Sequence, residues 1–100
     1  MNRVDCKKLL SSIITDLKNN SSYKEIERKY NVQISFFEDY FLFRIEDFFE
    51  GNIKGYKKKD YKIQKEIYFH FMEDLSQCWV EIKVYSYKEN DFEYITIYEI

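Results

Sequence analysis

Apolar residues recur at helical spacing near the start of the chain. Cys6, Leu10, Ile13 and Leu17 lie three or four residues apart, and Ile14 lies beside them. This spacing places the five side chains on one face of a helix. We therefore predict a helix over residues 3–18.

A second, shorter helix follows a polar connection at residues 19–22. Ser22 and Glu25 form a capping-box pattern, in which the Ser hydroxyl accepts from the amide of residue 25 and the carboxylate reaches back. Tyr23, Ile26 and Tyr30 have the spacing of an inward face. Asn31 suits a left-handed residue at the end of this helix.

The segment from residue 32 to residue 50 has two readings. Val32, Ile34 and Phe36 alternate as in a strand, whereas a longer stripe fits a helix that ends at Gly51. We favour a helix over 34–50. The stripe consists of Phe37, Tyr40, Phe41, Ile45 and Phe48.

Beyond residue 60 the apolar pattern changes to period two. Residues 61–72 favour a strand, with a helix as the alternative, and residues 78–87 and 92–99 predict two further strands. Residues 88–91 fit a four-residue hairpin loop. Pairing residue 87 with residue 92 gives one apolar face and one outer face. The outer face would carry Trp79, Glu81, Lys83, Tyr85, Tyr94, Thr96 and Tyr98.

These elements predict an α+β fold in a single domain over residues 1–100. Two or three N-terminal helices in a helix-turn-helix-like arrangement would precede a three-stranded antiparallel meander. Residues 1–50 would be mainly helical, residues 51–60 a basic loop, and residues 61–100 mainly β.

Composition adds an origin and a compartment to this picture. Half of the 100 residues are Lys, Ile, Asn, Tyr or Phe, and Pro and Ala are absent, as expected of an AT-rich gene of a phage or a low-GC bacterium. No apolar run follows the charges at residues 1–8, so we expect no signal peptide. Cys6 and Cys78 resemble buried free thiols. We expect a cytoplasmic protein, in the host cytoplasm if a phage encodes it.

The residues that carry catalysis are scarce. His70 is the single histidine, and neither a nucleophile motif nor a glycine-rich phosphate loop is present. His70, Cys6 and Cys78 lack the number and spacing of zinc ligands. We therefore expect no enzyme activity, no metal and no cofactor.

The charge is unevenly distributed. Residues 51–65 contain six basic residues and one acidic residue, a net charge of +5, in a chain whose net charge is −2. Lys57, Lys58 and Lys59 in this loop are candidate nucleic-acid contacts.

Residues 22–41 resemble the helix-turn-helix of bacterial and phage regulators. Asn31 takes the turn, while Glu27 stands where the family usually has a small residue. The resemblance implies DNA-reading positions at Gln33, Ile34, Ser35, Glu38 and Asp39, which are acidic for a DNA surface. The apolar positions of the family match Ile26, Tyr30, Val32, Phe37 and Tyr40.

A helix over 34–50 would present an outward face that combines carboxylates with large apolar groups. Exposed apolar side chains beside charges are typical of interfaces. This face would consist of Asp39, Glu46, Glu50, Phe43, Phe36 and Leu42. Trp79, Tyr85, Tyr94 and Tyr98 on the outer sheet face form a second candidate partner-binding patch.

The leading functional hypothesis is a small inhibitor or adaptor that docks on a partner protein. In overall character, and in no motif, the chain is similar to small phage anti-defence proteins such as the anti-CRISPR proteins. That likeness implies a partner that handles nucleic acid and is blocked by acidic and aromatic residues. Charge reversal at Asp39, Glu46 and Glu50 would then abolish binding. The alternatives are a small helix-turn-helix DNA-binding regulator and a homo-oligomer.

Overall fold

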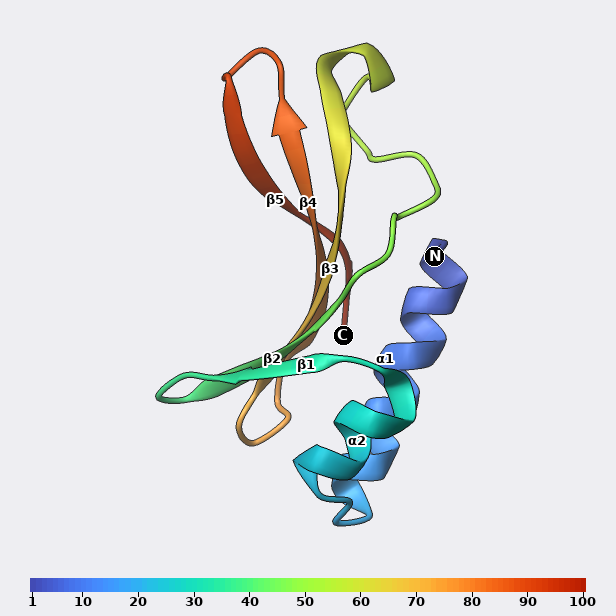
Figure 1. Cartoon of the computed structure of the whole chain (residues 1–100), viewed down its shortest axis with the longest axis vertical. Coiled ribbons are helices and arrows are strands. Elements are labelled where there is room, and N and C mark those ends of the chain that lie inside the picture. The colour runs from blue at the N-terminus through green and yellow to red at the C-terminus, as the bar shows by residue number, and fades with distance from the viewer.

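The computed structural model describes all 100 residues, which form two helices and one five-stranded antiparallel sheet (Figure 1). The strands follow one another across the sheet in the order β1-β2-β3-β4-β5. The α+β class is as predicted, but the prediction of a three-stranded sheet is wrong. The elements are α1 (Arg3–Lys18), α2 (Tyr23–Tyr30), β1 (Gln33–Phe36), β2 (Tyr40–Ile45), the short 3₁₀ helix η1 (Lys58–Asp60), β3 (Tyr61–Met72), β4 (Cys78–Ser86) and β5 (Asp91–Glu99).

The two helices begin and end at local signals in the sequence. Asn2 caps α1 through a reciprocal capping box with Asp5. The Ser22 hydroxyl accepts from the Glu25 amide at 3.2 Å and starts α2. Asn31 ends α2 in the left-handed conformation, with φ of 53°. The predicted helix over 3–18, the Ser22 cap and the left-handed Asn31 are confirmed.

The prediction of a helix over 34–50 is wrong, because this segment forms the β1–β2 hairpin and an irregular stretch. Phe41 and Phe43 point to the buried side of the sheet, and Tyr40, Leu42 and Arg44 point to the other side. Both sides of β2 therefore carry large apolar groups, which hides the period of two. Gly51 has φ of 151° in the stretch after the hairpin and ends no helix.

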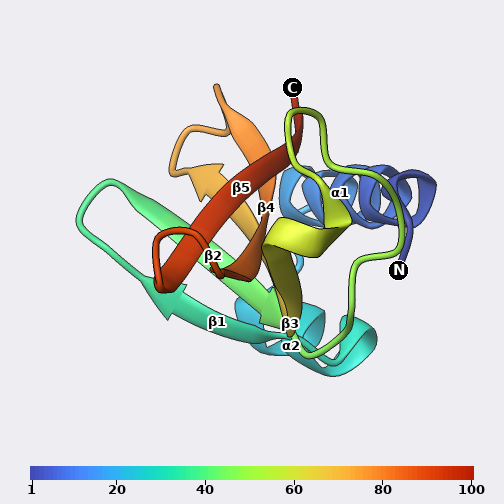
Figure 2. The same ribbon diagram turned by 90° about the horizontal axis from the view of Figure 1, so that it is seen from above.

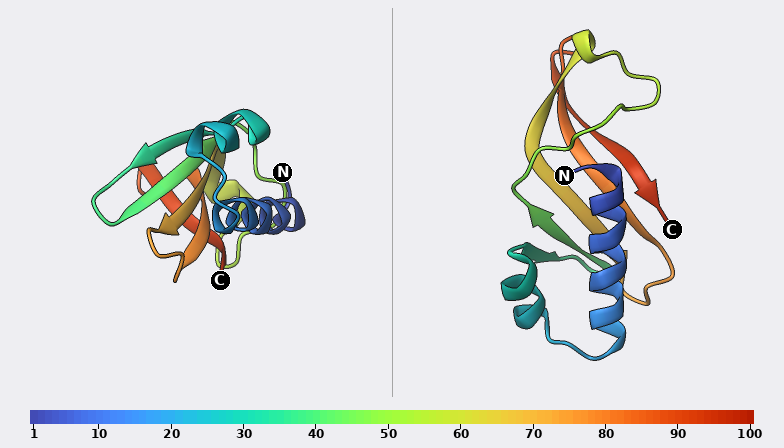
Figure 3. Two further views of the ribbon diagram at one scale, coloured as in Figure 1. Left: turned by 90° about the horizontal axis from the view of Figure 1, so that it is seen from below. Right: turned by 90° about the vertical axis from the view of Figure 1, so that its right-hand side faces the viewer.

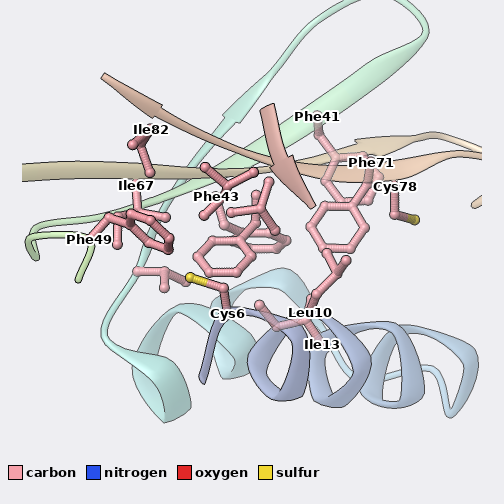
Figure 4. Close-up of a cluster of buried hydrophobic side chains, with 14 of the residues drawn as sticks. Cys6, Leu10, Ile13, Phe41, Phe43, Phe49, Ile67, Phe71, Cys78 and Ile82 are labelled. Carbon is pink, nitrogen blue, oxygen red and sulfur yellow. The ribbon is translucent and has the colours of Figure 1, made fainter. Parts of the chain in front are cut away.

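The core lies between the sheet and a layer formed by α1, α2 and the segment 46–60 (Figures 2 and 3). Cys6, Leu10 and Ile13 of α1 face the rings of the central strands (Figure 4). Phe49 and Ile53 are buried from the same side. Every element of the second layer thus covers one face of the sheet only.

The cysteines are free and buried, as predicted. Burial raises the pKa of the Cys6 thiol to about 11, so this thiol stays protonated at neutral pH. No helix of the chain is long and apolar enough to cross a membrane.

The β4–β5 hairpin corrects the predicted pairing by two residues. Ser86 lies opposite Asp91, and Tyr85 lies opposite Phe92, so the four-residue turn covers 87–90 instead of 88–91. A register shift between Val80 and Glu81 follows further along the hairpin.

The register shift reverses the side to which the end of β5 points. Tyr98 lies opposite the buried Val80 and packs against the core, with the Lys7 ammonium 5.7 Å from its ring centroid. The prediction that Tyr98 belongs to the outer face is wrong, because period two holds only up to the bulge.

Candidate functional site

One face of the sheet has no second layer over it, since both helices lie on the opposite side (Figures 1 and 3). Pairing aligns Leu42, His70 and Trp79 in one row across β2, β3 and β4. Arg44, Tyr68 and Glu81 form the next row. We call this surface the open face. It consists of Tyr40, Leu42, Arg44, Glu66, Tyr68, His70, Trp79, Glu81, Lys83, Tyr85, Phe92, Tyr94 and Thr96.

The rings of the open face pack on one another. His70 and Trp79 are stacked, with ring centroids 4.8 Å apart and planes 1° apart. Tyr68 and Tyr94 meet edge to face at 5.5 Å. Trp79 and Tyr68 are therefore half-buried although nothing covers them. Contacts within the face itself therefore hold these four rings in place.

Charged groups cross the same face in a chain of ion pairs. Arg44 Nη1 lies 3.3 Å from Glu66 Oε1, and Lys83 Nζ lies 3.2 Å from Glu66 Oε2. Burial alone would raise the pKa of Glu66, but the two cations stabilise the carboxylate and lower the pKa below its usual value. The positive and negative charges at the centre of the open face thus largely compensate one another.

His70 is the most buried polar residue of the open face, with 9% of its surface exposed. Its Nε2 lies 2.6 Å from Glu81 Oε1, but neither Nε2 nor Nδ1 makes a hydrogen bond. Burial lowers the pKa of His70, and the Glu81 carboxylate opposes that shift in part. The imidazole is neutral at neutral pH and serves as a flat ring against Trp79.

Three of the four aromatic residues predicted as a partner-binding patch on the outer sheet face lie on one face. Trp79, Tyr85 and Tyr94 belong to the open face, and Tyr98 does not. The sequence pattern did not indicate Arg44 as a member of this face, because it favours a helix where β2 lies. It also did not show that Tyr68 and His70 lie beside Glu81 and Trp79 of β4. The alternation of residues 61–72 was the available signal for those two.

The residues predicted for one helical face are dispersed. Phe43 is fully buried, whereas Phe36 is exposed at the edge strand β1 and Leu42 belongs to the open face. Leu42 points away from Phe43 because neighbouring residues of a strand point to opposite sides. Phe36 lies opposite Phe41, on the same side as Phe43, but at the exposed edge of the sheet.

The three carboxylates of that predicted face also lie apart. Asp39 lies in the β1–β2 turn, where its carbonyl accepts from the Glu73 amide at 3.1 Å. Glu46 pairs with Arg44 at 3.6 Å between Nη1 and Oε1, and Glu50 pairs with Asn2 through the backbone. Charge reversal at all three positions therefore no longer tests a single surface.

The predicted lysine loop lies at the end of the sheet remote from the β1–β2 turn. The Tyr87 amide donates to the Asp60 carbonyl at 2.9 Å and holds η1 against the end of β4. Lys57, Lys58 and Lys59 are exposed there.

The positions that the helix-turn-helix resemblance assigns to DNA reading lie in β1 and the following turn. Gln33, Ile34 and Ser35 are strand residues, and the Ile34 amide donates to Glu27 Oε2 at 3.1 Å. The Glu27 carboxylate thereby covers a backbone donor at the edge of the sheet.

No group of three or more His, Cys, Asp or Glu residues is arranged to hold a metal ion. Comparison with protein-family models, curated proteins and solved structures finds no match for this chain.

Proposed function

We propose that this protein is a small non-enzymatic binding protein that docks on a partner protein through the open face. One observation carries the proposal: the open face is an ordered surface of Trp, Tyr and Arg side chains over which the chain places no layer of its own.

Order within the open face lowers the cost of binding. Immobilising a rotamer-rich side chain at an interface costs roughly 0.5–1.5 kcal/mol. Trp79 is already stacked on His70, and Arg44 is already held by Glu66. Trp, Tyr and Arg are also the residue types that contribute most to protein interfaces. Four strands about nine residues long make a face of roughly 600 Å² in projection, near the ~800 Å² that a partner commonly buries.

The charge pattern favours a protein partner over a phosphate backbone at the centre of this face. Glu66 and Glu81 compensate the charges of Arg44 and Lys83, so the centre has no excess of positive charge to attract phosphates. A protein surface can match alternating charges pair by pair, which gives specificity. An inhibitor or adaptor that acts by occupying a partner's surface needs no chemistry of its own. Small size and phage-like composition agree with that role.

The test is capture of partners from lysate of the native host, followed by binding with the purified partner. The open-face variant carries Trp79→Ala and Tyr94→Ala. The matched control carries Val4→Ala and Lys8→Ala, two exposed positions on α1. We expect one protein to be retained by the wild type and the control. The Trp79/Tyr94 variant should bind it at least tenfold more weakly.

Two further measurements complete the test. Circular dichroism and thermal unfolding check that the variants are folded. Hydrogen exchange in the complex should slow at the open face rather than at α1. Equal retention by all three proteins would refute the proposal. So would a homodimer, detected by its mass, whose interface is the open face.

A further inference from the structure

The end of the sheet opposite the β1–β2 turn collects exposed lysines. Lys57, Lys58 and Lys59 come from the loop and η1, Lys62 from β3, and Lys88 from the β4–β5 turn. We call this region, together with Tyr85, Tyr87 and Phe92, the basic end. All five lysines are exposed, and none takes part in an ion pair. The exposed carboxylates of Asp60, Glu89 and Asp91 lie in the same region, so its net charge is +2.

The fold fixes these lysines beside the turn instead of leaving them on a free loop. The Tyr87 amide donates to the Asp60 carbonyl at 2.9 Å, and Tyr61 pairs with Ser86. In the next pair Lys62 lies directly opposite Tyr85. In Figure 1 the η1 turn and the β4–β5 turn lie side by side at the top, as these contacts require.

The basic end also presents aromatic rings on the side of the open face. The Tyr85 ring meets Tyr87 at 5.9 Å and Phe92 at 5.3 Å between centroids, in both cases edge to face. Tyr87 is 56% exposed and Phe92 is 49% exposed. Lys83 Nζ lies 4.5 Å from the Phe92 ring centroid, so cations flank these rings as well.

We infer that the basic end binds a single strand of nucleic acid. Lysines without partners attract a chain of phosphates, and exposed rings next to them stack on unpaired bases. A duplex hides the faces of its bases, and η1 has three residues, too few to read a groove. The centre of the open face offers no excess of positive charge, because Glu66 and Glu81 compensate Arg44 and Lys83, so we expect the strand at the basic end.

The inference goes beyond the proposed function and does not depend on it. A partner protein on the open face and a strand at the basic end would meet at Tyr85 and Phe92, which belong to both surfaces. The protein would then contact both components of a complex that handles nucleic acid.

The test is fluorescence anisotropy with labelled 12-nucleotide oligo(dT), oligo(rU) and a duplex of equal length, at 50 and 200 mM salt. We expect micromolar binding of at least one single strand at 50 mM. Three or four neutralised phosphates on a single strand predict a roughly 20- to 50-fold weaker affinity at 200 mM. The duplex should bind at least tenfold more weakly than that strand.

Two variants separate the contributions of charge and stacking. The triple variant Lys57→Gln, Lys58→Gln, Lys59→Gln should weaken binding at least tenfold and flatten the salt dependence. Tyr87→Ala with Phe92→Ala should weaken binding at least fivefold and leave the salt dependence unchanged. The control Lys8→Gln, Lys18→Gln, Lys24→Gln removes the same charge from exposed helix positions and should bind as the wild type does.

Several outcomes would overturn the inference. One is the absence of binding below 100 µM at 50 mM salt. Another is a loss of affinity in the helix control as large as in the triple lysine variant. A third is duplex affinity equal to that of the single strand, together with unchanged affinity in the Tyr87/Phe92 variant. Equally tight binding of polyglutamate, lost in the lysine variant, would assign the basic end to acidic proteins instead. The Trp79/Tyr94 variant should bind the oligonucleotide normally, which separates failure here from failure of the proposed function.

Discussion

His70 shows how one residue can belong to a surface and still behave as a core residue. It lies on the face of the sheet that no helix covers, yet Trp79, Tyr40 and Tyr68 surround its ring. Burial makes the neutral imidazole the favoured form. The imidazole that stacks on Trp79 is therefore neutral at neutral pH.

The pH dependence of stability follows from that depressed pKa. The unfolded chain takes up the proton near the ordinary value of 6.5, before the folded chain does. As pH falls through this value, the free energy of unfolding therefore decreases, and this loss stops once pH is below the folded pKa. We expect the melting temperature to fall between pH 7.5 and 5.5.

The variant His70→Gln is the control for this prediction. Glutamine stays neutral over this interval, so the melting temperature of the variant should change less between pH 7.5 and 5.5. Identical pH profiles for the wild type and the variant would assign the effect to another group.

At the scale of elements, local signals predicted the ends of the chain better than its middle. Capping residues and period-3.6 spacing identified α1 and α2, and alternation identified β3, β4 and β5. In β2 the outward residues Tyr40 and Leu42 are as apolar as the inward residues Phe41 and Phe43, because β2 faces a core on one side and the open face on the other. A run of this kind has no period that separates strand from helix.

The site was predictable to the same extent. Trp79, Tyr85 and Tyr94 follow from alternation alone, whereas Arg44 joins them only because β2 pairs with β3. The inward turn of Tyr98 depends on a bulge that no local signal marked.

Phe36 and Phe43, which the helix prediction places on one face, differ in burial and so give a direct test of the hairpin. Phe43 is fully buried against Phe41 and Phe71, and Phe36 is 59% exposed. We expect Phe43→Ala to lower the free energy of unfolding by about 3–5 kcal/mol. Phe36→Ala removes ring contacts with Tyr23 and should cost about 1 kcal/mol. Urea unfolding measures both, and equal costs would contradict the burial of Phe43 and the exposed edge position of Phe36.

At the scale of the whole molecule, Arg3 joins three parts of the chain. Its Nε donates to the Ile97 carbonyl of β5 at 3.1 Å, and its Nη2 donates to the Asn52 carbonyl at 3.2 Å. The guanidinium carbon lies 5.5 Å from the Phe49 ring centroid. The first turn of α1 thus connects the segment 46–60 to the edge strand.

Removing this connection should affect the segment more than the sheet. We expect Arg3→Ala to lower the free energy of unfolding by about 1–2 kcal/mol, because two charge-assisted hydrogen bonds are lost at a partly exposed site. Amide exchange of residues 49–54 should accelerate, while that of β3 and β4 changes little. Arg3→Lys keeps the charge but cannot donate to both carbonyls at once. Its free energy of unfolding should lie between those of the wild type and Arg3→Ala. Uniform acceleration across the chain would contradict this role.

The placement of α1 has a consequence for the order in which the molecule assembles. This helix is translated first, yet the strands that it packs against, β4 and β5, are translated after every other element. The sheet itself can grow hairpin by hairpin, since each strand pairs with its neighbour in sequence. Until β4 and β5 have emerged from the ribosome, Cys6, Leu10 and Ile13 lack the part of their cover that these two strands supply. The packing of α1 is therefore complete only once β5 has been translated, and the apolar stripe of α1 stays partly exposed until then.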